Sequence, residues 1–297
     1  MNYSLSLLEL SGLNVLLALS VYATLKVGQF SLAQVGFWSI GAYVGGILTT
    51  LHGLALLPAL LACGALCALI GVLLGYPCLR IRGIYLALAT VAFSEVVRVF
   101  FHNLKYQVSV GGNLLGPDGS LGFRGISVLT GWPQILCAVV LAGGAFAWLE
   151  KSRIGLAANA VREDETAAAC AGIDVVAIKV GMFALGAFLA GVGGALYATH
   201  ISFVNSDNFG FHLALISIFF VAVGGTERFI GPLIGAVLLT ILPEVLRFAG
   251  DFRMIVYGAI VLALALLFPR GLADHFRTRA STQRAATSQS AATTGTP

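Results

Sequence analysis

The sequence predicts an all-α integral membrane protein that crosses the bilayer about nine times, within a range of about eight to ten. Three observations support this prediction. Of the 297 residues, 58% are hydrophobic and only 10% are charged, whereas an average soluble domain is about 25% charged. Apolar runs of transmembrane length follow one another along the chain, since a helix needs about 20 apolar residues to cross a bilayer. The 36 glycines fit this class, because glycine lets membrane helices pack closely.

Each predicted span is an apolar segment bounded by charged or turn-forming residues. The segments are 8–27, 30–51, 54–76, 84–101, 132–149, 180–199, 211–223, 230–248 and 254–268. The second is rich in Gly, Ser and Gln, which also allows a broken or re-entrant helix. The seventh is short and runs into VGGTERFIG, which allows a cytoplasmic turn or a re-entrant bend. The first follows MNYSLSLLEL, which has no basic residues, so we expect a retained span rather than a signal peptide.

The distribution of Lys and Arg predicts the orientation, because these residues accumulate on the cytoplasmic side. With segment 150–179 inside, five of the 17 Lys and Arg residues fall outside, namely Arg98, Lys105, Arg124, Arg247 and Arg253. The remaining twelve fall inside. We therefore expect the N-terminus outside and the C-terminus in the cytoplasm.

The segment 150–179 interrupts the apolar pattern. It holds nine of the chain's charged residues, which comprise 17 Lys and Arg and 13 Asp and Glu, so it must face water. Its middle, 156–171, is rich in alanine, the best helix former, which predicts one short helix between Gly155 and Gly172. Two interpretations remain open: a solvated connector, or a helix presented to a partner.

Two further segments are not apolar spans. Segment 102–131 is a long, glycine-rich outer loop. A phosphate-binding loop would follow a strand and end in GK[ST], and the sequence shows neither here. The segment is therefore either a series of turns or an external docking or gating element. Apart from Phe276, residues 273–297 are alanine, small or polar residues, and we predict a disordered cytoplasmic tail there. The transmembrane domain then covers residues 1–272.

No catalytic, metal-binding or nucleic-acid-binding pattern is present in the sequence. GxxxxGK[ST], HExxH and GxSxG are absent, and the five histidines are scattered. The five cysteines form no CxxC pair, and we interpret Cys63 and Cys67 as packing residues. The net charge of +4 comes from loops and tail. We expect no cofactor, no metal, no catalytic residue and no nucleic-acid partner.

Ionisable residues at membrane depth are expensive and mark candidate sites. Glu95 precedes Arg98 by three residues, and Glu244 precedes Arg247 by three, so each pair shares a helix face. Such pairs either line a cavity that accepts a zwitterion, or form salt bridges near the lipid headgroups. Glycines at i,i+4 spacing predict close helix crossings and not a ligand site: Gly41 and Gly45, Gly71 and Gly75, Gly231 and Gly235.

Six motifs in order closely resemble the LivM-type permease subunits of branched-chain amino acid ABC importers, over nearly all of the chain except the tail. They are GQFSLAQVGFWSIGAY (28–43), RIRGIYLALATVAFSEVVR (80–98), the 150–179 segment with the FALGAFLAGVGGALYA that follows it, VGGTERFIGPLIGA (223–236), LPEVLR (242–247) and MIVYGAIVLALALLFPRGL (254–272).

The resemblance implies an ABC importer permease fold and a non-enzymatic subunit in the bacterial inner membrane. Its implied partners are membrane lipid, a second, LivH-like permease, two ATP-binding cassette ATPase subunits and an extracytoplasmic amino-acid-binding protein. The implied function is ATP-driven import of Leu, Ile or Val by alternating access. Related permeases carry urea, short amides or other amino acids, so these remain alternative substrates.

The resemblance also implies that segment 150–179 carries a cytoplasmic coupling helix, which sits in a cleft of the ATPase. TAAACAG (166–172) is similar to the EAAxxxG loop of importer permeases, with the leading acid displaced by one position. The charged residues of the segment would set its register at the rim of the ATPase cleft, and its small residues would allow the two proteins to approach closely. The implied coupling residues are Arg162, Glu163, Asp164, Glu165, Ala168 and Gly172.

Departures from the family bear on substrate. The family often has Gly and His where this chain has Ala33 and Gln34, and its outer TGG motif is SVGGN at 109–113 here. Together with the two Glu–Arg pairs, the departure at position 34 gives the candidate substrate pathway: Gln34, Glu95, Arg98, Glu244 and Arg247. Two rival classes remain open: an ion-coupled secondary transporter that titrates Glu95 or Glu244, and an intramembrane enzyme.

Overall fold

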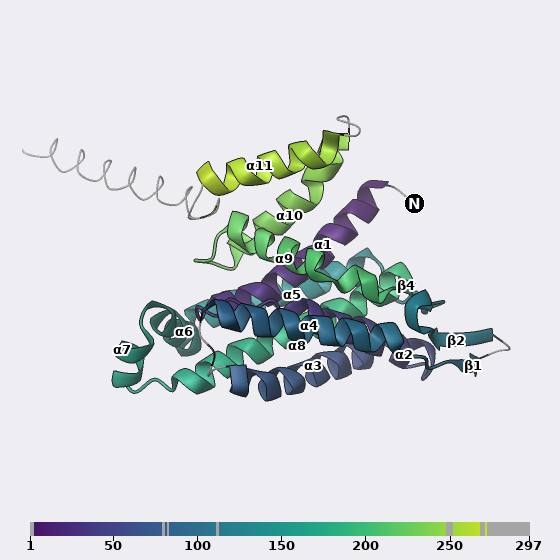
Figure 1. Cartoon of the computed structure of the whole chain (residues 1–297), viewed down its shortest axis with the longest axis horizontal. Helices are drawn as coiled ribbons and strands as arrows, with labels where there is room; N and C mark the ends of the chain where they lie inside the picture. Colours follow the sequence, from purple (N-terminus) through teal and green to yellow (C-terminus); the bar gives the residue numbers. More distant parts are fainter. Residues whose placement is uncertain are drawn as a thin grey trace, which may run out of the picture.

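A computed structural model describes residues 3–78, 81, 83–110, 113–247, 252–267 and 271. The predicted tail at 273–297 lies outside these residues, as do Arg80 and Arg82. The helices of the described chain are α1 (Tyr3–Leu25), α2 (Gln34–Thr50), α3 (Leu56–Cys78), α4 (Ile84–Asn103), α5 (Trp132–Lys151), α6 (Arg153–Glu163), α7 (Glu165–Cys170), α8 (Val175–Ile201), α9 (Phe211–Gly224), α10 (Ile230–Val245) and α11 (Arg253–Leu267) (Figure 1).

Helices occupy all nine predicted spans, which confirms the all-α membrane class. Within the described residues, five of them are long and apolar enough to cross a bilayer: α1, α3, α4, α5 and α8. The others, α2, α9, α10 and α11, have 17, 14, 16 and 15 residues, fewer than the about 20 of a full span. The number of spans therefore stays a prediction.

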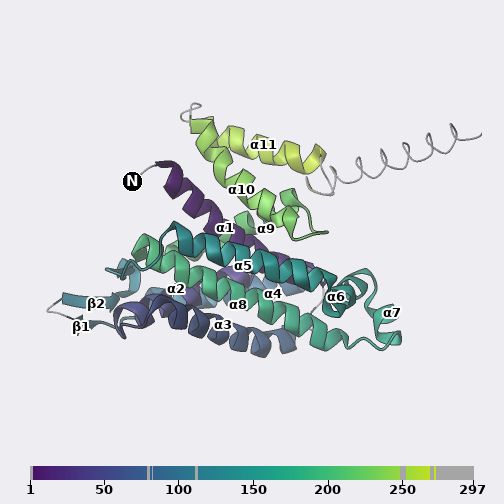
Figure 2. The same ribbon diagram turned by 180° about the vertical axis from the view of Figure 1, so that it is seen from behind.

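The polar composition of α2 reflects burial in protein. This helix is continuous from Gln34 to Thr50, so the alternative of a broken helix is wrong for these residues. Thirteen of its 17 residues are buried. It lies along α8, which also packs against α3 and α1 (Figure 2). Gly, Ser and Gln are tolerated here because α2 faces other helices instead of lipid.

Glycines set the close crossings in this core. A Cβ at Gly41 would run into the backbone of Gly191, and one at Gly194 into the carbonyl of Trp38. The α9–α10 pair behaves alike, because a Cβ at Gly235 would meet the carbonyl of Phe220. Backbones this close leave no room for any side chain. The predicted packing role of Gly41 and of Gly235 is confirmed.

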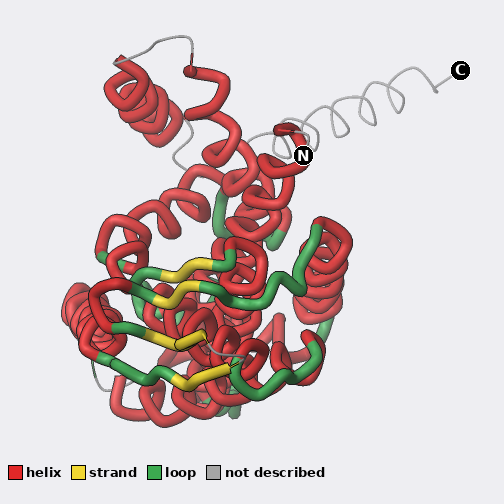
Figure 3. The backbone as a smooth tube through the Cα atoms, turned by 90° about the vertical axis from the view of Figure 1, so that its right-hand side faces the viewer, coloured by secondary structure: helices red, strands yellow, loops and turns green. Residues whose placement is uncertain are grey.

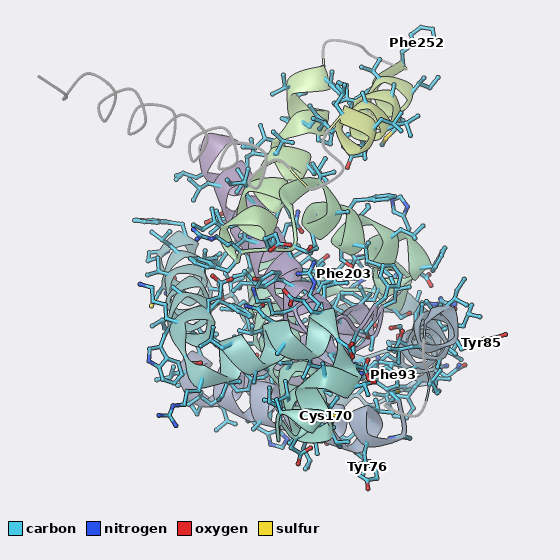
Figure 4. The ribbon with its side chains drawn as sticks, turned by 90° about the vertical axis from the view of Figure 1, so that its left-hand side faces the viewer. Tyr76, Tyr85, Phe93, Cys170, Phe203 and Phe252 are labelled. Atoms are coloured by element: carbon cyan, nitrogen blue, oxygen red, sulfur yellow. The ribbon has the colours of Figure 1, made fainter. Side chains whose placement is uncertain are left out.

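The outer helices α3, α4 and α5 expose large apolar side chains, in contrast to the buried, glycine-rich contacts of α2 and α8. Tyr76 and Tyr85 are 64% and 71% exposed, and both point away from the bundle in Figure 4. Exposed leucines and valines continue along α3, α4 and α5. An apolar exterior of this extent is what a membrane protein presents to acyl chains.

At one end of the bundle, which we call the sheet end, the chain forms a small antiparallel sheet in the order β1-β2-β3-β4 (Figure 3). The register pairs Val108 with Leu115, Gly116 with Arg124 and Phe123 with Val204. The described residues of segment 102–131 thus include three paired strands, and describing the segment as only a series of turns is wrong. The strands and 3-10 helices are β1 (Val108–Val110), β2 (Asn113–Pro117), η1 (Gly119–Leu121), β3 (Phe123–Arg124), β4 (Phe203–Val204) and η2 (Ser206–Phe209).

At the opposite end, the loop end, α6 and α7 project from the bundle (Figures 1 and 2). The prediction of one helix across 156–171 is wrong, because two helices meet at Asp164. Asp164 has an extended backbone, with φ −153° and ψ 111°. Aspartate favours this arrangement because its side chain hydrogen-bonds the next backbone N–H groups in place of continuing the helix.

Candidate functional site

The first half of the loop-end segment is a sharp corner between α5 and α6. The Ser152 hydroxyl accepts a hydrogen bond from Gly155 N at 3.3 Å and donates one to Leu149 O at 2.7 Å. A Cβ at Gly155 would run into the Leu149 carbonyl. The corner therefore requires glycine, and α6 buries Ala158 and Val161 against the bundle.

The second half, α7, is capped at both ends. Asp164 Oδ1 accepts hydrogen bonds from Thr166 N at 2.8 Å and Ala167 N at 3.0 Å. At the other end Gly172 has φ +81°. Gly172 N and Ile173 N donate to the carbonyls of Ala169 and Ala168, at 3.0 and 3.1 Å. This is the Schellman arrangement, in which glycine relieves the strain of a left-handed residue.

The predicted coupling residues play different structural roles. Glu165 pairs with Lys179 Nζ of α8 at 2.5 Å, Ala168 is buried, and Gly172 is exposed with open space beside its Cα. Arg162 donates to Thr226, and Asp164 is the α7 cap. Glu163 is exposed, and no ion pair to it is found among the described residues. Three of the four predicted rim charges therefore hold the segment in place.

Asp164→Ala is expected to fray α7 without affecting the membrane helices. The substitution removes both cap bonds, and loss of such a cap costs about 1 kcal/mol of helix stability. Hydrogen exchange of the amides of Thr166 and Ala167 should accelerate about fivefold, since 1.4 kcal/mol corresponds to a factor of ten. Glu163→Ala is the control, and equal exchange in the two variants would contradict the assignment of the cap.

A cluster of buried and half-buried polar groups lies where the loop-end segment joins the bundle. Glu150, at the end of α5, accepts a hydrogen bond from the Tyr22 hydroxyl at 2.6 Å and one from Phe229 N at 2.8 Å. Lys26 Nζ lies 3.8 Å from the same carboxylate oxygen and donates to Glu227 O at 2.7 Å. We call these residues, together with Arg162 and Thr226, the Glu150 cluster.

Arg162 completes the Glu150 cluster from α6. Its two guanidinium nitrogens donate to Thr226 O at 3.1 Å and to Thr226 Oγ1 at 2.8 Å. Lys26, in the turn after α1, has only 6% of its side chain exposed. Burial lowers the pKa of Lys26, whereas the Glu150 carboxylate acts to raise it. A buried ammonium needs such a partner, so the charges of Lys26 and Glu150 depend on each other.

Among the residues of the Glu150 cluster, the sequence analysis gave a role to Arg162 alone, as an implied coupling residue. Lys26 and Glu150 were counted only as charges at the ends of apolar segments, and Tyr22 lies inside one. A usable signal existed. Lys26 and Glu150 carry opposite charges at the predicted cytoplasmic ends of two spans, and residues 225–229 form a polar interruption on the same predicted side. Together they predict a polar contact if those span ends are neighbours.

The two predicted ion pairs are both formed. Arg98 Nε donates to Glu95 Oε1 at 2.8 Å, and Arg98 Nη1 donates to Asp207 Oδ1 of η2 at 2.9 Å. Arg247 Nη1 lies 3.5 Å from Glu244 Oε1, and 72% of the Arg247 side chain is exposed. No interaction among the described residues joins the two pairs. Asp207 is the partner that the sequence pattern missed.

Gln34 occupies a different environment. It is fully buried at the start of α2, and neither its amide nitrogen nor its amide oxygen has a hydrogen-bond partner in the described residues. A Cβ at Gly186 would lie 3.0 Å from the Gln34 Nε2 atom. The structure therefore places Gln34 between α2 and α8, and no hydrogen bond among the described residues connects it with Glu95 or Glu244.

Comparison with known proteins gives a consistent answer. A family model described as "Branched-chain amino acid transport system / permease component" matches residues 3–265. The high-affinity branched-chain amino acid transport system permease protein LivM of Salmonella typhimurium is 30% identical over 287 residues, as is LivM of Escherichia coli. In both cases the alignment covers 88% of this chain and 66% of the relative, so the chain spans just under two thirds of their length.

A third relative covers nearly the whole of its own length. The probable branched-chain amino acid transport permease protein LivH of Methanocaldococcus jannaschii is 30% identical over 292 residues, covering 88% of this chain and 89% of the relative. No solved structure matches significantly. Since the family model spans nearly all of the described helices, this chain belongs to the family of branched-chain amino acid transport permease components.

Proposed function

We propose that this chain is the LivM-like half of a two-permease translocation pathway that imports branched-chain amino acids at the expense of ATP. The family supports the transport class. The observation that carries the mechanism is the doubly capped α6–α7 segment, which projects from the bundle and is joined to it by buried polar groups. ATP hydrolysis belongs to partner subunits, so the permease itself is not an enzyme.

The α6–α7 segment would dock into a cleft of one of the two ATP-binding cassette subunits. Its exposed side includes Leu156 and Ile154, which are 63% and 48% exposed although they lie outside the spans. Exposed apolar side chains at a water-facing end indicate a protein contact. Glu163 supplies a free charge at the rim, whereas Gly172 leaves open space for close approach.

The loop end would then face the cytoplasm of a bacterial cell and the sheet end the outside of its inner membrane, with the C-terminus inside. The sheet end would receive an extracytoplasmic amino-acid-binding protein. It holds a polar hollow of about 220 Å³, lined in part by Asp118 and Arg124. Opposite charges in one hollow favour electrostatic complementarity with a docked protein.

The substrate pathway would run past Glu95 and Arg98, with Gln34, Glu244 and Arg247 as further candidates. About half of the Glu95 side chain is exposed on α4. A charged group against lipid is costly, so we assign this face of α4 to the LivH-like partner and the pathway between the two permeases. A carboxylate beside a guanidinium complements the ammonium and carboxylate of an amino acid.

The decisive experiment is purification of the intact complex in mild detergent, followed by ATPase assays with amino acids, urea and short amides presented on the co-purified binding protein. We expect stimulation by Leu, Ile or Val. Stimulation only by urea, an amide or another amino acid would keep the importer class and replace the substrate. Absence of an ATPase and a second permease, with uptake abolished by a protonophore, would favour the ion-coupled rival.

A further inference from the structure

The loop between α9 and α10 is attached to the loop-end segment at two points. Glu150, which directly precedes the last residue of α5, accepts a hydrogen bond from Phe229 N at 2.8 Å. Arg162, in the last turn of α6, donates to both oxygens of Thr226. Any displacement of α6 therefore pulls or pushes on residues 225–229.

The helix that leads into this loop, α9, also reaches the sheet end. It has 14 residues and a length of about 21 Å at 1.5 Å per residue. Asp207 lies just before it in η2 and accepts a hydrogen bond from Arg98 at 2.9 Å. Thus one end of α9 is attached to α5 and α6 of the loop-end segment, and the other end is attached to the Glu95–Arg98 pair.

The α9–α10 pair is rigid enough to act as one body. A Cβ at Gly224 would run into the Gly231 carbonyl, and one at Gly235 into the Phe220 carbonyl, so the two backbones are in direct contact. Packed helices of this kind transmit a displacement instead of absorbing it, because close-packed interiors do not deform continuously. Resting on the proposed function, we propose that α9 is the rod through which the coupling segment moves the Glu95–Arg98–Asp207 ion pairs.

In this arrangement Glu150 and Arg162 are positioning residues. Neither touches substrate; they fix the loop 225–229 to α5 and α6. The joint is stronger than a fully exposed contact because it combines charge-assisted hydrogen bonds with partial burial. At the other end Arg98 is the joint, since it bonds Glu95 of α4 and Asp207 of η2 together.

Two spin labels on the complete transporter test the rod. Cys170 of α7 is exposed and reports on the loop end when Cys78 and Cys137 are changed to Ser. Asn208→Cys, in a background that also lacks Cys170, reports on η2. The variants are Glu150→Ala with Arg162→Gln, which removes the acceptor for Phe229 N and the guanidinium that bonds Thr226, and Thr226→Val alone, which removes a single hydroxyl and is expected to leave the fold intact. Arg153→Gln, an exposed change on α6, is the matched control.

ATP binding is expected to change the spectra of both labels in the parent protein and in Arg153→Gln. In the double variant the label at Cys170 should still respond, whereas the response at position 208 and the substrate moved per ATP hydrolysed should each fall about fivefold or more, the lower range of common coupling effects. Thr226→Val should lower both in the same direction by less.

An unchanged response at position 208 in the double variant, with normal uptake per ATP, would overturn the rod while leaving the proposed function intact. A parent protein whose Cys170 label ignores ATP would instead overturn the proposed function, and the rod with it. Loss of both responses in the double variant alone would show that the cluster only supports folding of α6, which also contradicts the proposal.

Discussion

Changing Glu165 to Arg together with Gly172 to Leu is expected to yield a transporter complex that still hydrolyses ATP but takes up little substrate. The first substitution replaces the 2.5 Å ion pair with Lys179 by two like charges. The second places a branched side chain at φ +81°, a conformation that costs residues other than glycine about 1–2 kcal/mol. Both changes displace α7 but leave the membrane helices, and so assembly, untouched.

The measurement is uptake and ATP hydrolysis in the same proteoliposomes, normalised to the amount of assembled complex. Uptake per ATP should fall about tenfold, which corresponds to 1.4 kcal/mol. Glu165→Gln together with Gly172→Asn is the control, since asparagine tolerates the left-handed conformation. Full uptake in the Arg and Leu variant would refute the assignment of α7 as a coupling element.

Gly194→Leu is expected to prevent accumulation of folded protein. The crossing of α2 and α8 places the Gly194 Cα directly against the carbonyl of Trp38 and close to Ala42 N, where not even a Cβ fits. Overpacking of cores typically costs about 1–3 kcal/mol, and here the obstacle is backbone, which cannot rotate away. The helices must separate, and the loss should reach or exceed the upper end of that range.

Gly181 gives a matched control on the same helix. It is exposed, and nothing lies within 4 Å of an added Cβ. Gly181→Leu should therefore keep the parent's elution profile and thermal midpoint in detergent, whereas Gly194→Leu should aggregate or be degraded. Equal yields and midpoints for the two variants would show that the helices do not meet at this crossing.

The positions of the membrane helices were predictable because they follow from a local requirement. A backbone in lipid must satisfy its own hydrogen bonds, so a run of apolar residues becomes a helix wherever it occurs. Segments 84–101 and 132–149 match α4 and α5 within two residues at each end. The i,i+3 pairing of Glu95 with Arg98 follows from helix geometry in the same way.

Local features of the α6–α7 segment were predicted less well. Alanine content predicts helix across 156–171, but a single residue, Asp164, ends α6 and begins α7. Its side chain offers the backbone an alternative set of hydrogen bonds, and this competition is not visible in composition. The pairing of β3 with β4 was missed for another reason: β4 follows α8 and lies far along the chain.

The sequence by itself determined that the chain is a membrane protein, where its helices lie, that segment 150–179 interrupts the apolar pattern, and which family the motifs resemble. These properties depend on residue type and on spacing within one segment. Only the tertiary structure decided which segments meet. Glu150 contacts Tyr22 across 128 residues and Phe229 across 79, and Arg98 contacts Asp207 across 109. Such contacts depend on which helices are neighbours, and that is set by how closely glycine-lined surfaces let their backbones approach.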